Sequence, residues 1–468
     1  MPNPKSSQTA HYDAIVIGSG QAGTPLSQAL ASAGMRTALV ERVHVGGTCI
    51  NEGCTPTKTM VASGRVAYLA RRGADYGVQV GSLHVDMLRV RKRKRDIVDL
   101  FRNGSQKRIE QARNLDLIFG AAEFTTPNSI LVRDKKRQER VLTADRFFIN
   151  AGCRPSVPQI VGLKDVPFLD STSIMELNAV PEHLLVLGGG YIGLEFGQLF
   201  RRFGSRVTII QSGSSLLSGE DADIASAVAQ ILKEDGIQIL VSSRAEKVAR
   251  HGSHIHLKIR SGGKMHSLEG SHLLVAAGRI PNIDTLKVSA AGIDTDARGF
   301  IQVNEKLETS AKNIYALGDI NGGPAFTHIS YDDFRIIRKN LLEKGNVSTA
   351  GRLVPYTLFI DPQLGRVGLS ETEARLQNRA IRVAKMPMNY VARALEVDES
   401  RGFMKAVVDA KSGQILGAAV LGIEGGEIIS QIQIAIMGKL PYTSLQNAVF
   451  AHPTLSESLN NLFNHFLT

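Results

Sequence analysis

The amino-acid sequence predicts an α/β protein built from two similar strand, turn and helix units and a C-terminal α+β region. A short apolar strand at 13–17 leads into Gly18-Ser19-Gly20-Gln21-Ala22-Gly23 and then into a helical pattern. The same order returns at Gly188-Gly189-Gly190-Tyr191-Ile192-Gly193. From residue 356 onward, shorter strands and helices alternate. A chain of 468 residues has room for about two to four domains.

The first glycine turn has the features of a dinucleotide-binding fingerprint. Glycines there let a pyrophosphate approach the backbone at the N-terminus of the following helix. The next strand, 37–40, ends in Glu41, about 20 residues after the glycines, where a carboxylate can hold ribose hydroxyls. Because a strand precedes the turn and a helix follows it, the match is specific.

The second unit differs at one position. Gln211 stands at the end of strand 207–210, where the first unit has Glu41. The missing carboxylate removes the repulsion that would exclude a 2′-phosphate, yet the next residues, 212–215, include no arginine. NADH and NADPH therefore both stay open. Two such units indicate one dinucleotide held as a prosthetic group and one that visits.

A cysteine pair lies between the two units. Cys49 and Cys54 follow two glycines and precede a helical pattern at 60–72, so they are expected near a helix N-terminus, which lowers the pKa of a thiol. Lys58 follows Cys54 by one helical turn. The alternatives are two structural thiols or half of a zinc site. Zinc is disfavoured, and no metal site is expected, because Cys153 is the only other cysteine and has no partner at ligand spacing.

Three further places carry candidate site residues. The strand that ends near Ile149 runs into Ala151, Gly152 and Cys153, and prolines then mark a domain boundary. Strand 273–276 closes in Gly278 and Arg279, and strand 313–316 leads to Gly318 and Asp319. Asp319 could bind a polyol chain or cap a strand. His452 and Glu457 could form a catalytic pair, or could be a loop histidine and a helix-start acid.

Composition limits the partners. The formal net charge is +11, part of it in the dense run 89–95, which is interpreted as a solvated helix face. Nucleic-acid binding is disfavoured because no stacking aromatic residues interrupt that run. The polar start at 1–11, the absence of an apolar run of membrane length and the low cysteine content predict a soluble, cytoplasmic protein with no membrane partner.

Together these stretches resemble the flavoprotein disulfide reductases, the family of dihydrolipoamide dehydrogenase, glutathione reductase, mycothione reductase and mercuric reductase. The most specific likeness is the run from Gly46 to Lys58, and the resemblance extends over the chain after Tyr12. It implies an FAD-binding domain at 1–153 and 281–350, an NAD(P)-binding domain at 154–280 and a dimerisation domain at 351–468. The implied cofactor-binding residues are Gly18, Gly20, Gly23, Glu41, Gly47, Thr48, Ala151, Gly152, Gly318, Asp319, Gly188, Gly190, Tyr191, Gly193, Gln211, Gly278 and Arg279.

The resemblance also implies a mechanism. Hydride passes from NAD(P)H to FAD, and the flavin reduces a disulfide between Cys49 and Cys54. Cys54 faces the flavin and Cys49 attacks the substrate. The further roles that the likeness implies are an aromatic lid for Tyr191, an ion pair beside the flavin for Lys58 and Glu195, and a general acid oriented by a carboxylate for His452 and Glu457. Because His452 comes from the second subunit in this family, a homodimer is expected.

The substrate expected from this likeness is a small disulfide or an oxidised sulfur species, in a reaction similar to that of dihydrolipoamide dehydrogenase. Ordinary mercuric reduction is disfavoured because the chain ends at 466–468 without a cysteine pair, and transhydrogenase activity because Cys49 is present. Glu52 and Thr55 depart from the apolar residues usual at their positions, and a carboxylate at Glu52 would repel glutathione. Cys153 is expected to be a packing residue.

Two alternatives stay open. One is a reductase of mercuric or other metal ions, or of hypothiocyanous acid, within the same family. The remote one is a flavin-bearing protein whose basic run at 89–95 contacts nucleic acid or an acidic partner.

Overall fold

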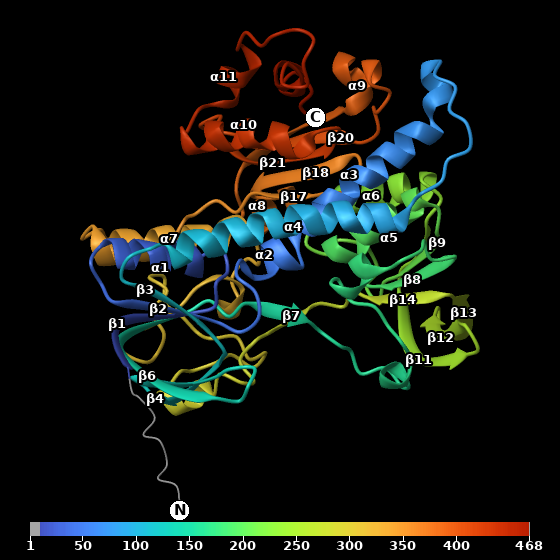
Figure 1. Ribbon diagram of the computed structural model, residues 1–468. Coiled ribbons are helices and arrows are strands. Elements are labelled where there is room, and N and C mark those ends of the chain that lie inside the picture. Colours follow the sequence, from blue (N-terminus) through green and yellow to red (C-terminus); the bar gives the residue numbers. More distant parts are fainter. Residues whose placement is uncertain (1–9, 468) are drawn as a thin grey trace, which may run out of the picture. The chain divides into compact units, whose positions relative to one another are not determined.

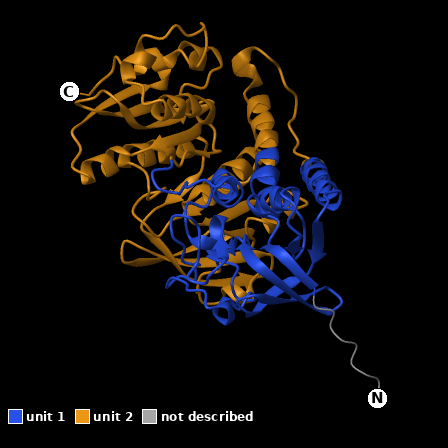
Figure 2. Cartoon of the chain, turned by 90° about the vertical axis from the view of Figure 1, so that its left-hand side faces the viewer, with its two compact units in different colours: residues 1–59, 91–156, 278–352 blue, residues 60–90, 157–277, 353–468 orange. Residues whose placement is uncertain are grey.

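The computed structural model describes residues 10–467 and shows the α/β architecture that the sequence predicts (Figure 1). The chain divides into two compact units, and each is described by itself (Figure 2). Unit 1 comprises residues 1–59, 91–156 and 278–352, and unit 2 comprises residues 60–90, 157–277 and 353–468. The first nine residues and Thr468, which enter the expectations about a leader and about the C-terminus, lie outside the described residues.

Unit 1 is organised around a sheet with the strand order β3-β2-β1-β6-β5-β4, and β16 pairs with β6. Its strands are β1 (Ala10–Ile17), β2 (Thr37–Glu41), β3 (Leu115–Phe119), β4 (Ala121–Thr126), β5 (Ser129–Arg133), β6 (Glu139–Ile149) and β16 (Ile314–Ala316). The short strands β7 (Cys153–Pro155) and β15 (Arg279–Pro281) form a separate antiparallel pair. The helices of this unit are α1 (Gly23–Ser32), α2 (Gly47–Asn51) and α7 (Thr327–Leu342), with the 3-10 turns η4 (Val288–Ala291) and η5 (Gly318–Asn321).

The centre of this sheet is fully apolar because it is covered on both faces. β1 pairs in parallel with β2 and β6, and Ala14, Ile15 and Val16 are completely buried. Helices α1 and α7 pack on one face through a cluster that includes Leu26 and Phe334. Because β1, β2 and β6 run parallel, their carboxyl ends lie at the same edge of the sheet. The first glycine turn directly follows β1 at that edge.

The region 115–150 differs in part from the small meander that the sequence suggests. β4, β5 and β6 form antiparallel neighbours, but β3 pairs in parallel with β2, and β6 pairs in parallel with β1. Alternation of apolar residues predicts strands but not their partners, which are chosen by contacts distant in sequence.

Two long helices have residues in both units: α3 (Cys54–Arg71) and α4 (Met87–Glu110). The interpretation of 89–95 as a solvated face is wrong for Lys94, which is only 4% exposed. Helical spacing explains this burial, because Lys94 shares a face with Val98, which is 5% exposed. No helix within residues 10–467 is both long and apolar enough to cross a membrane.

Unit 2 contains a second parallel sheet, of order β10-β9-β8-β14, an antiparallel sheet of order β11-β12-β13 and a C-terminal antiparallel sheet of order β17-β18-β21-β20-β19. The strands are β8 (His183–Leu187), β9 (Arg206–Ile210), β10 (Gln238–Leu240), β11 (Ser243–His251), β12 (His254–Ser261), β13 (Lys264–Gly270), β14 (His272–Val275), β17 (Tyr356–Leu358), β18 (Gln363–Gly368), β19 (Ile381–Pro387), β20 (Phe403–Asp409) and β21 (Ile415–Gly422). The helices are α5 (Tyr191–Phe203), α6 (Ala222–Glu234), α8 (Glu371–Leu376), α9 (Ala392–Glu396), α10 (Gly425–Met437), α11 (Tyr442–Gln446) and α12 (Ser458–Leu462). Short 3-10 turns are η1 (Gly73–Tyr76), η2 (Leu163–Asp165), η3 (Ser173–Glu176) and η6 (Met388–Tyr390).

Each face of the parallel sheet in unit 2 has its own cover. Leu184 and Val186 on β8 pack with Phe196 and Phe200 of α5, whereas the alternate residue Leu185 packs with Leu257 of β12. The C-terminal sheet packs against α10 in a further cluster. The predicted domain boundaries at 153, 281 and 350 stay a prediction.

Candidate active site

The first glycine turn is shaped so that only glycine fits. Gly18 has a φ of +99°, and a Cβ there would lie 2.3 Å from the carbonyl oxygen of Asn150. A Cβ on Gly23 would lie 2.0 Å from the carbonyl oxygen of Gly18. The Gly23 N–H donates to Asn150 Oδ1 at 2.9 Å, which ties the turn to the end of β6. The turn therefore brings bare backbone to the start of α1, as a bound pyrophosphate requires.

Glu41 is fixed beside this turn. Its Oε2 accepts hydrogen bonds from the Ser19 N–H at 3.0 Å and the Ser19 hydroxyl at 2.6 Å, and its Oε1 accepts from the Val43 N–H at 2.8 Å. The structure thus places the predicted carboxylate at the end of β2, where it can hold ribose hydroxyls.

Further residues of unit 1 test whether the first glycine turn and its surroundings fit FAD. A Cβ on Gly47 would lie 2.7 Å from the Cα of Gly20, so the cysteine loop closes tightly onto the glycine turn. Asp319 is the second residue of η5, which follows β16. Burial raises the pKa of the Asp319 carboxyl, against the opposing charge of Arg279. A half-buried acid shortly after the end of β16 and a glycine turn against which the cysteine loop packs tightly fit a bound flavin dinucleotide.

The remaining predicted cofactor residues of unit 1 lie on nearby turns of the same unit. Gly152 has a φ of +64° and follows Ala151 at the end of β6, and Gly318 has a φ of +72° at the start of η5. Arg279 Nη2 donates to the Cys153 carbonyl at 2.6 Å, across the β7–β15 pair that begins after Gly278. Thr48 is exposed within α2.

The cysteine pair lies on two consecutive helices. Cys49 is within α2 and half-buried, and Cys54 is the first residue of α3 and exposed. All three cysteines of the chain are among the described residues, and none forms a disulfide. The hydroxyl of Thr327, the first residue of α7, contacts Cys54 Sγ at 3.3 Å.

The expected lowering of the thiol pKa is wrong for Cys49. A hydrogen bond with Cys54 and burial both raise the pKa of Cys49, while Thr327 and Lys58 act in the opposite direction. Ionisation of Cys54 would oppose ionisation of Cys49, since two like charges would then lie side by side. A base near Cys49 is therefore needed for its attack on a substrate.

Two residues that brace the cysteine loop were not singled out from the sequence. The Asn51 side-chain amide donates to the carbonyls of Val45 and Gly47, both at 2.9 Å. Arg102 Nε on α4 donates to Asn51 Oδ1 at 2.6 Å. Asn51 lies inside the cysteine motif, which was the available signal, whereas nothing local marks Arg102. Glu52 is exposed.

Cys153 has the environment of a packing residue. It is 5% exposed, burial raises its pKa to about 12, and its thiol donates to the Asp319 carbonyl at 3.3 Å.

The second glycine turn repeats the first in unit 2. A Cβ on Gly188 would lie 2.3 Å from the Ala276 carbonyl oxygen, and one on Gly193 would lie 2.1 Å from the Gly188 carbonyl oxygen. Gln211 Oε1 accepts from the Gly189 N–H at 3.0 Å. Gly190 is the N-cap of α5, with open space where a Cβ would be. The amide of Gln211 thus occupies the place that the Glu41 carboxylate has in unit 1.

One face of α5 carries polar side chains that bind the segment 356–361, at spacings of three and four residues. They are Tyr191, Glu195, Gln198 and Arg202. Glu195, 7% exposed, accepts from the Phe359 N–H at 2.9 Å. The predicted pairing of Glu195 with Lys58 joins residues of different units and stays a prediction.

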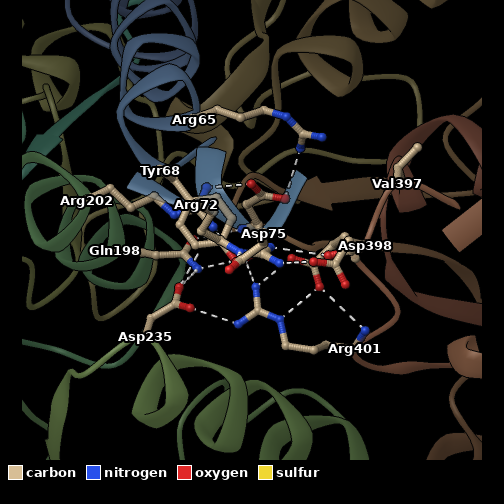
Figure 3. Close-up of polar contacts among 12 residues, drawn as sticks. Arg65, Tyr68, Arg72, Asp75, Gln198, Arg202, Asp235, Val397, Asp398 and Arg401 are labelled. Carbon is tan, nitrogen blue, oxygen red and sulfur yellow. Dashed lines mark hydrogen bonds and ion pairs between the residues drawn. The ribbon is translucent and has the colours of Figure 1, made fainter. Parts of the chain in front are cut away.

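The far end of this face belongs to a buried polar network (Figure 3). Gln198 and the backbone of Asp361 exchange two hydrogen bonds, at 2.7 and 2.8 Å, and Arg202 binds the Asp361 carboxylate. Asp235 accepts from Gln198 at 2.7 Å and pairs with Arg401 at 2.8 Å. These contacts hold α5 firmly against the start of the C-terminal region.

His452 and Glu457 do form a pair. His452 Nδ1 lies 2.9 and 3.1 Å from the two carboxylate oxygens of Glu457. The His452 side chain is 73% exposed and that of Glu457 only 19%, so the acid orients an imidazole that is open to solvent. Both line a cavity of about 300 Å³ beside Tyr390 and Asn461. Within the described residues, no group of three or more His, Cys, Asp and Glu side chains could hold a metal ion.

Comparisons with known proteins agree with this geometry. Residues 12–333 match the family described as pyridine nucleotide-disulphide oxidoreductase, and residues 354–463 match the dimerisation domain of that family. The chain belongs to the pyridine nucleotide-disulphide oxidoreductases. Members use FAD and NAD(P)H, and the chain is an FAD-dependent disulfide oxidoreductase. Its dimerisation domain supports a homodimer.

Several members of the family are similar over nearly the whole chain. A probable pyridine nucleotide-disulfide oxidoreductase, RclA of Escherichia coli (strain K12), is 39% identical over 456 residues, which cover 97% of this chain and 98% of RclA. A mercuric reductase of Bacillus cereus is 34% identical, covering 96% of this chain and 70% of the reductase. A dihydrolipoyl dehydrogenase of Vibrio parahaemolyticus is 31% identical, covering 95% of this chain and 93% of the dehydrogenase.

The fold likewise matches a solved structure. The Cu(II) complex of the HOCl-induced flavoprotein disulfide reductase RclA from Escherichia coli superimposes with a TM-score of 0.89 at 38% identity, covering 97% of this chain and 99% of that one. The fold class and the family that the sequence predicts are therefore confirmed.

Proposed function

We propose that the protein reduces a small disulfide or a related oxidised sulfur species at Cys49, with electrons that enter from NAD(P)H. The observation that carries this proposal is the sulfur pair: Cys49 within α2 interacts with Cys54, the first residue of the next helix, α3. When bound, FAD supplies two-electron transfer between the nicotinamide and the cysteines. The glycine turn of unit 1, Glu41 and Asp319 would hold it.

The two thiols would act in sequence on a disulfide substrate. The Cys49 thiolate attacks one substrate sulfur, the substrate S–S bond breaks, and the departing thiolate takes a proton. Cys54 then attacks the Cys49 sulfur and releases the second substrate thiol, which leaves a Cys49–Cys54 disulfide. Two electrons thus pass from the dithiol to the substrate.

His452 of the partner subunit would supply and remove the proton in this exchange. Its Nδ1 is held by Glu457, so the other ring nitrogen is directed to solvent and to an incoming site. The raised pKa of Cys49 explains why a base is needed, because a thiol that holds its proton is a poor nucleophile.

Lys58 and Glu195 would form the ion pair beside the flavin that the family likeness implies, and Tyr191 would cover the nicotinamide end of the second site. Gln211 carries no charge that excludes a 2′-phosphate, so both NADH and NADPH are compatible with unit 2. A dithiol that must return to its reduced form suits a reducing compartment such as the cytoplasm.

The experiment that tests the proposal is turnover of Cys49→Ser and Cys54→Ser with a panel of small disulfides, lipoamide and glutathione disulfide included. We expect the wild type to be active and either substitution to lower its turnover at least about 1,000-fold. The reason is that each thiol makes a bond that the other cannot make. The panel should show little activity with glutathione disulfide because of Glu52. Unchanged turnover in Cys49→Ser would overturn the dithiol mechanism.

The shared site can be tested with heterodimers of one Cys49→Ser subunit and one His452→Ala subunit, each inactive as a homodimer. If His452 serves the partner's cysteines, one site of the two stays intact and about half of the wild-type activity returns. If His452 serves its own chain, both sites are defective and activity stays absent.

A second candidate is reduction of a metal ion or of an oxidant such as hypothiocyanous acid at the same thiols. It is favoured by the relatives, which include mercuric reductases and the HOCl-induced flavoprotein disulfide reductase RclA, solved as a Cu(II) complex. Adding Cu(II), Hg(II) and hypothiocyanous acid to the substrate panel separates the two candidates by their kcat/KM values.

A further inference from the structure

Arg102 lies on the inward face of α4, in the part of that helix that belongs to unit 1. Helical spacing places it in line with Val98, Ser105 and Ile109, which are 5%, 7% and 0% exposed. Ile109 belongs to the same hydrophobic cluster as Val45, the residue that begins the cysteine loop, 45–54. The packing of α4 therefore fixes where the Arg102 guanidinium lies.

This guanidinium decides which way the Asn51 amide points. Arg102 Nε donates to Asn51 Oδ1 at 2.6 Å, and Arg102 Nη1 donates to Asp99 Oδ1 on the same helix at 3.2 Å. An arginine side chain has only donors, so the amide oxygen of Asn51 must face it. The amide nitrogen is thereby turned to the carbonyls of Val45 and Gly47, to which it donates at 2.9 Å each.

The amide closes the segment 45–51 into a ring. Asn51 is the last residue of α2, and the two accepting carbonyls lie at the entrance of that helix, so one side chain spans the turn that carries Cys49. The entrance is also tied to the first glycine turn, because the Gly46 N–H donates to the Ser19 hydroxyl at 3.1 Å. Helix α2 is thus held by the glycine turn where it begins and by α4 where it ends.

The position of α2 matters because Cys49 has to meet Cys54 in each turnover. In the second exchange of the proposed reaction, the Cys54 thiolate attacks the Cys49 sulfur of the mixed disulfide. The bond between the two cysteines forms, the bond to the substrate sulfur breaks, and the released thiolate takes a proton. This intramolecular step depends on how closely the loop holds the two sulfurs. A loop released from α4 would gain freedom as a dithiol that it has to lose again as a disulfide.

We propose that Arg102 is a positioning residue for the cysteine pair: by orienting the Asn51 amide, it holds α2 so that Cys49 and Cys54 close readily to a disulfide. This inference rests on the proposed function, because it takes the two thiols as the reacting pair. Arg102 acts through Asn51 and not on either sulfur. Its loss leaves the first attack by Cys49 in place and weakens the closing step.

The test is the thiol–disulfide equilibrium of the pair in the FAD-loaded protein. Wild type, Arg102→Met and Arg102→Lys are equilibrated anaerobically with mixtures of reduced and oxidised dithiothreitol, quenched with acid and alkylated. Mass spectrometry then counts the free thiols at Cys49 and Cys54. We expect Arg102→Met, which has no donor, to lower the closure constant about tenfold, equivalent to a reduction potential about 30 mV less negative. Arg102→Lys keeps a charged donor and should recover part of the loss.

Turnover should show the same step. With the most active disulfide of the substrate panel, a slower second exchange in Arg102→Met lowers kcat more than kcat/KM, which reports the first attack by Cys49. The mixed disulfide on Cys49 should also accumulate, and its added mass is detected after an acid quench.

Arg108→Met is the matched control. Arg108 is an exposed arginine of the same helix, and its guanidinium donates to the Ser105 hydroxyl at 3.2 Å, within α4. Its loss should leave the closure constant unchanged. Asn51→Ala completes a double-mutant cycle: Arg102→Met should add little in its background, because Arg102 acts through that amide. Unfolding midpoints separate loss of fold from loss of position, and Arg102→Lys serves as the second variant should Arg102→Met fold poorly.

The outcomes are distinct. An unchanged closure constant in folded Arg102→Met, an equal loss in Arg108→Met, or fully additive effects of Asn51→Ala and Arg102→Met would overturn the role of Arg102 and leave the dithiol function intact. A wild-type pair that formed no disulfide at any ratio of reduced to oxidised dithiothreitol would contradict the proposed function itself, and this inference with it.

Discussion

The two glycine turns have nearly the same backbone but hold different side chains beside it. In unit 1 the Glu41 carboxylate accepts hydrogen bonds from two groups of Ser19 and from the Val43 N–H, whereas in unit 2 the Gln211 amide oxygen accepts only from the Gly189 N–H. A charged acceptor with several donors suits a nucleotide that stays bound, and a neutral amide with one donor suits a nucleotide that exchanges. We propose that this change at a single strand end distinguishes the unit that holds FAD from the unit that the nicotinamide nucleotide visits.

The largest expected effects come from closing each turn with a methyl group. In Gly23→Ala the new Cβ would lie 2.0 Å from a carbonyl oxygen of unit 1, and in Gly193→Ala 2.1 Å from one of unit 2. We expect Gly23→Ala to lose most bound FAD, and Gly193→Ala to keep FAD but to lose about 100-fold in NAD(P)H affinity, since about 3 kcal/mol of lost contact corresponds to that factor.

Flavin absorbance per chain and the NAD(P)H dependence of flavin reduction check this pair, with circular dichroism to confirm that both variants fold. Loss of FAD from Gly193→Ala, with Gly23→Ala unaffected, would reverse the assignment of the two units.

A smaller effect is expected from exchanging the two side chains at the strand ends. Glu41→Gln should weaken FAD binding about tenfold, because hydrogen bonds to a charged acceptor become neutral ones. Gln211→Glu should lower the preference for NADPH over NADH about tenfold or more, because a carboxylate repels a 2′-phosphate. The ratio of kcat/KM values for the two nucleotides is the measurement, and an unchanged ratio in Gln211→Glu would show that Gln211 does not face the ribose.

The smallest expected effect comes from Asp221, which lies at the end of the loop after β9 and is the N-cap of α6. Burial opposes ionisation of Asp221, but hydrogen bonds from Thr372 and the charge of Lys405 lower its pKa to about 2. A carboxyl whose pKa is lower in the folded state contributes stability above its unfolded pKa of about 4, and loses that contribution as the pH falls toward 2.

Asp221→Asn should therefore lower the free energy of unfolding by about 1 kcal/mol at pH 7 and flatten its decline below pH 4. Urea unfolding of the holoenzyme between pH 7 and pH 3 is the measurement. Parallel pH profiles for the wild type and Asp221→Asn would contradict the origin of the effect.

Much of the fold and part of the site could be predicted from the sequence because their signals are local. The glycine turns, Glu41, Gln211 and the cysteine pair each lie within one strand, turn and helix, and the structure places them accordingly. His452 and Glu457 lie only five residues apart, so their contact is also local. The sequence alone had left open whether they form a pair.

The residues that sequence reasoning missed act across large sequence separations. Asn150 reaches Gly23, Thr327 reaches Cys54, and Glu220 reaches Tyr356 only because the sheets bring them together. The raised pKa of Cys49 was missed for a similar reason, since the helix start is local but the competing sulfur and the burial are not. Composition likewise could not show that Lys94 lies inside while its basic neighbours lie outside.

The central claim is that two differently equipped nucleotide units supply one dithiol. Anaerobic titration of the oxidised holoenzyme with NADH, or with NADPH, tests it directly, because a disulfide takes up two electrons beyond those of the flavin. We predict about two equivalents of NAD(P)H per flavin for the wild type and about one for Cys49→Ser. One equivalent for both proteins would show that no disulfide accepts electrons, and would contradict the account.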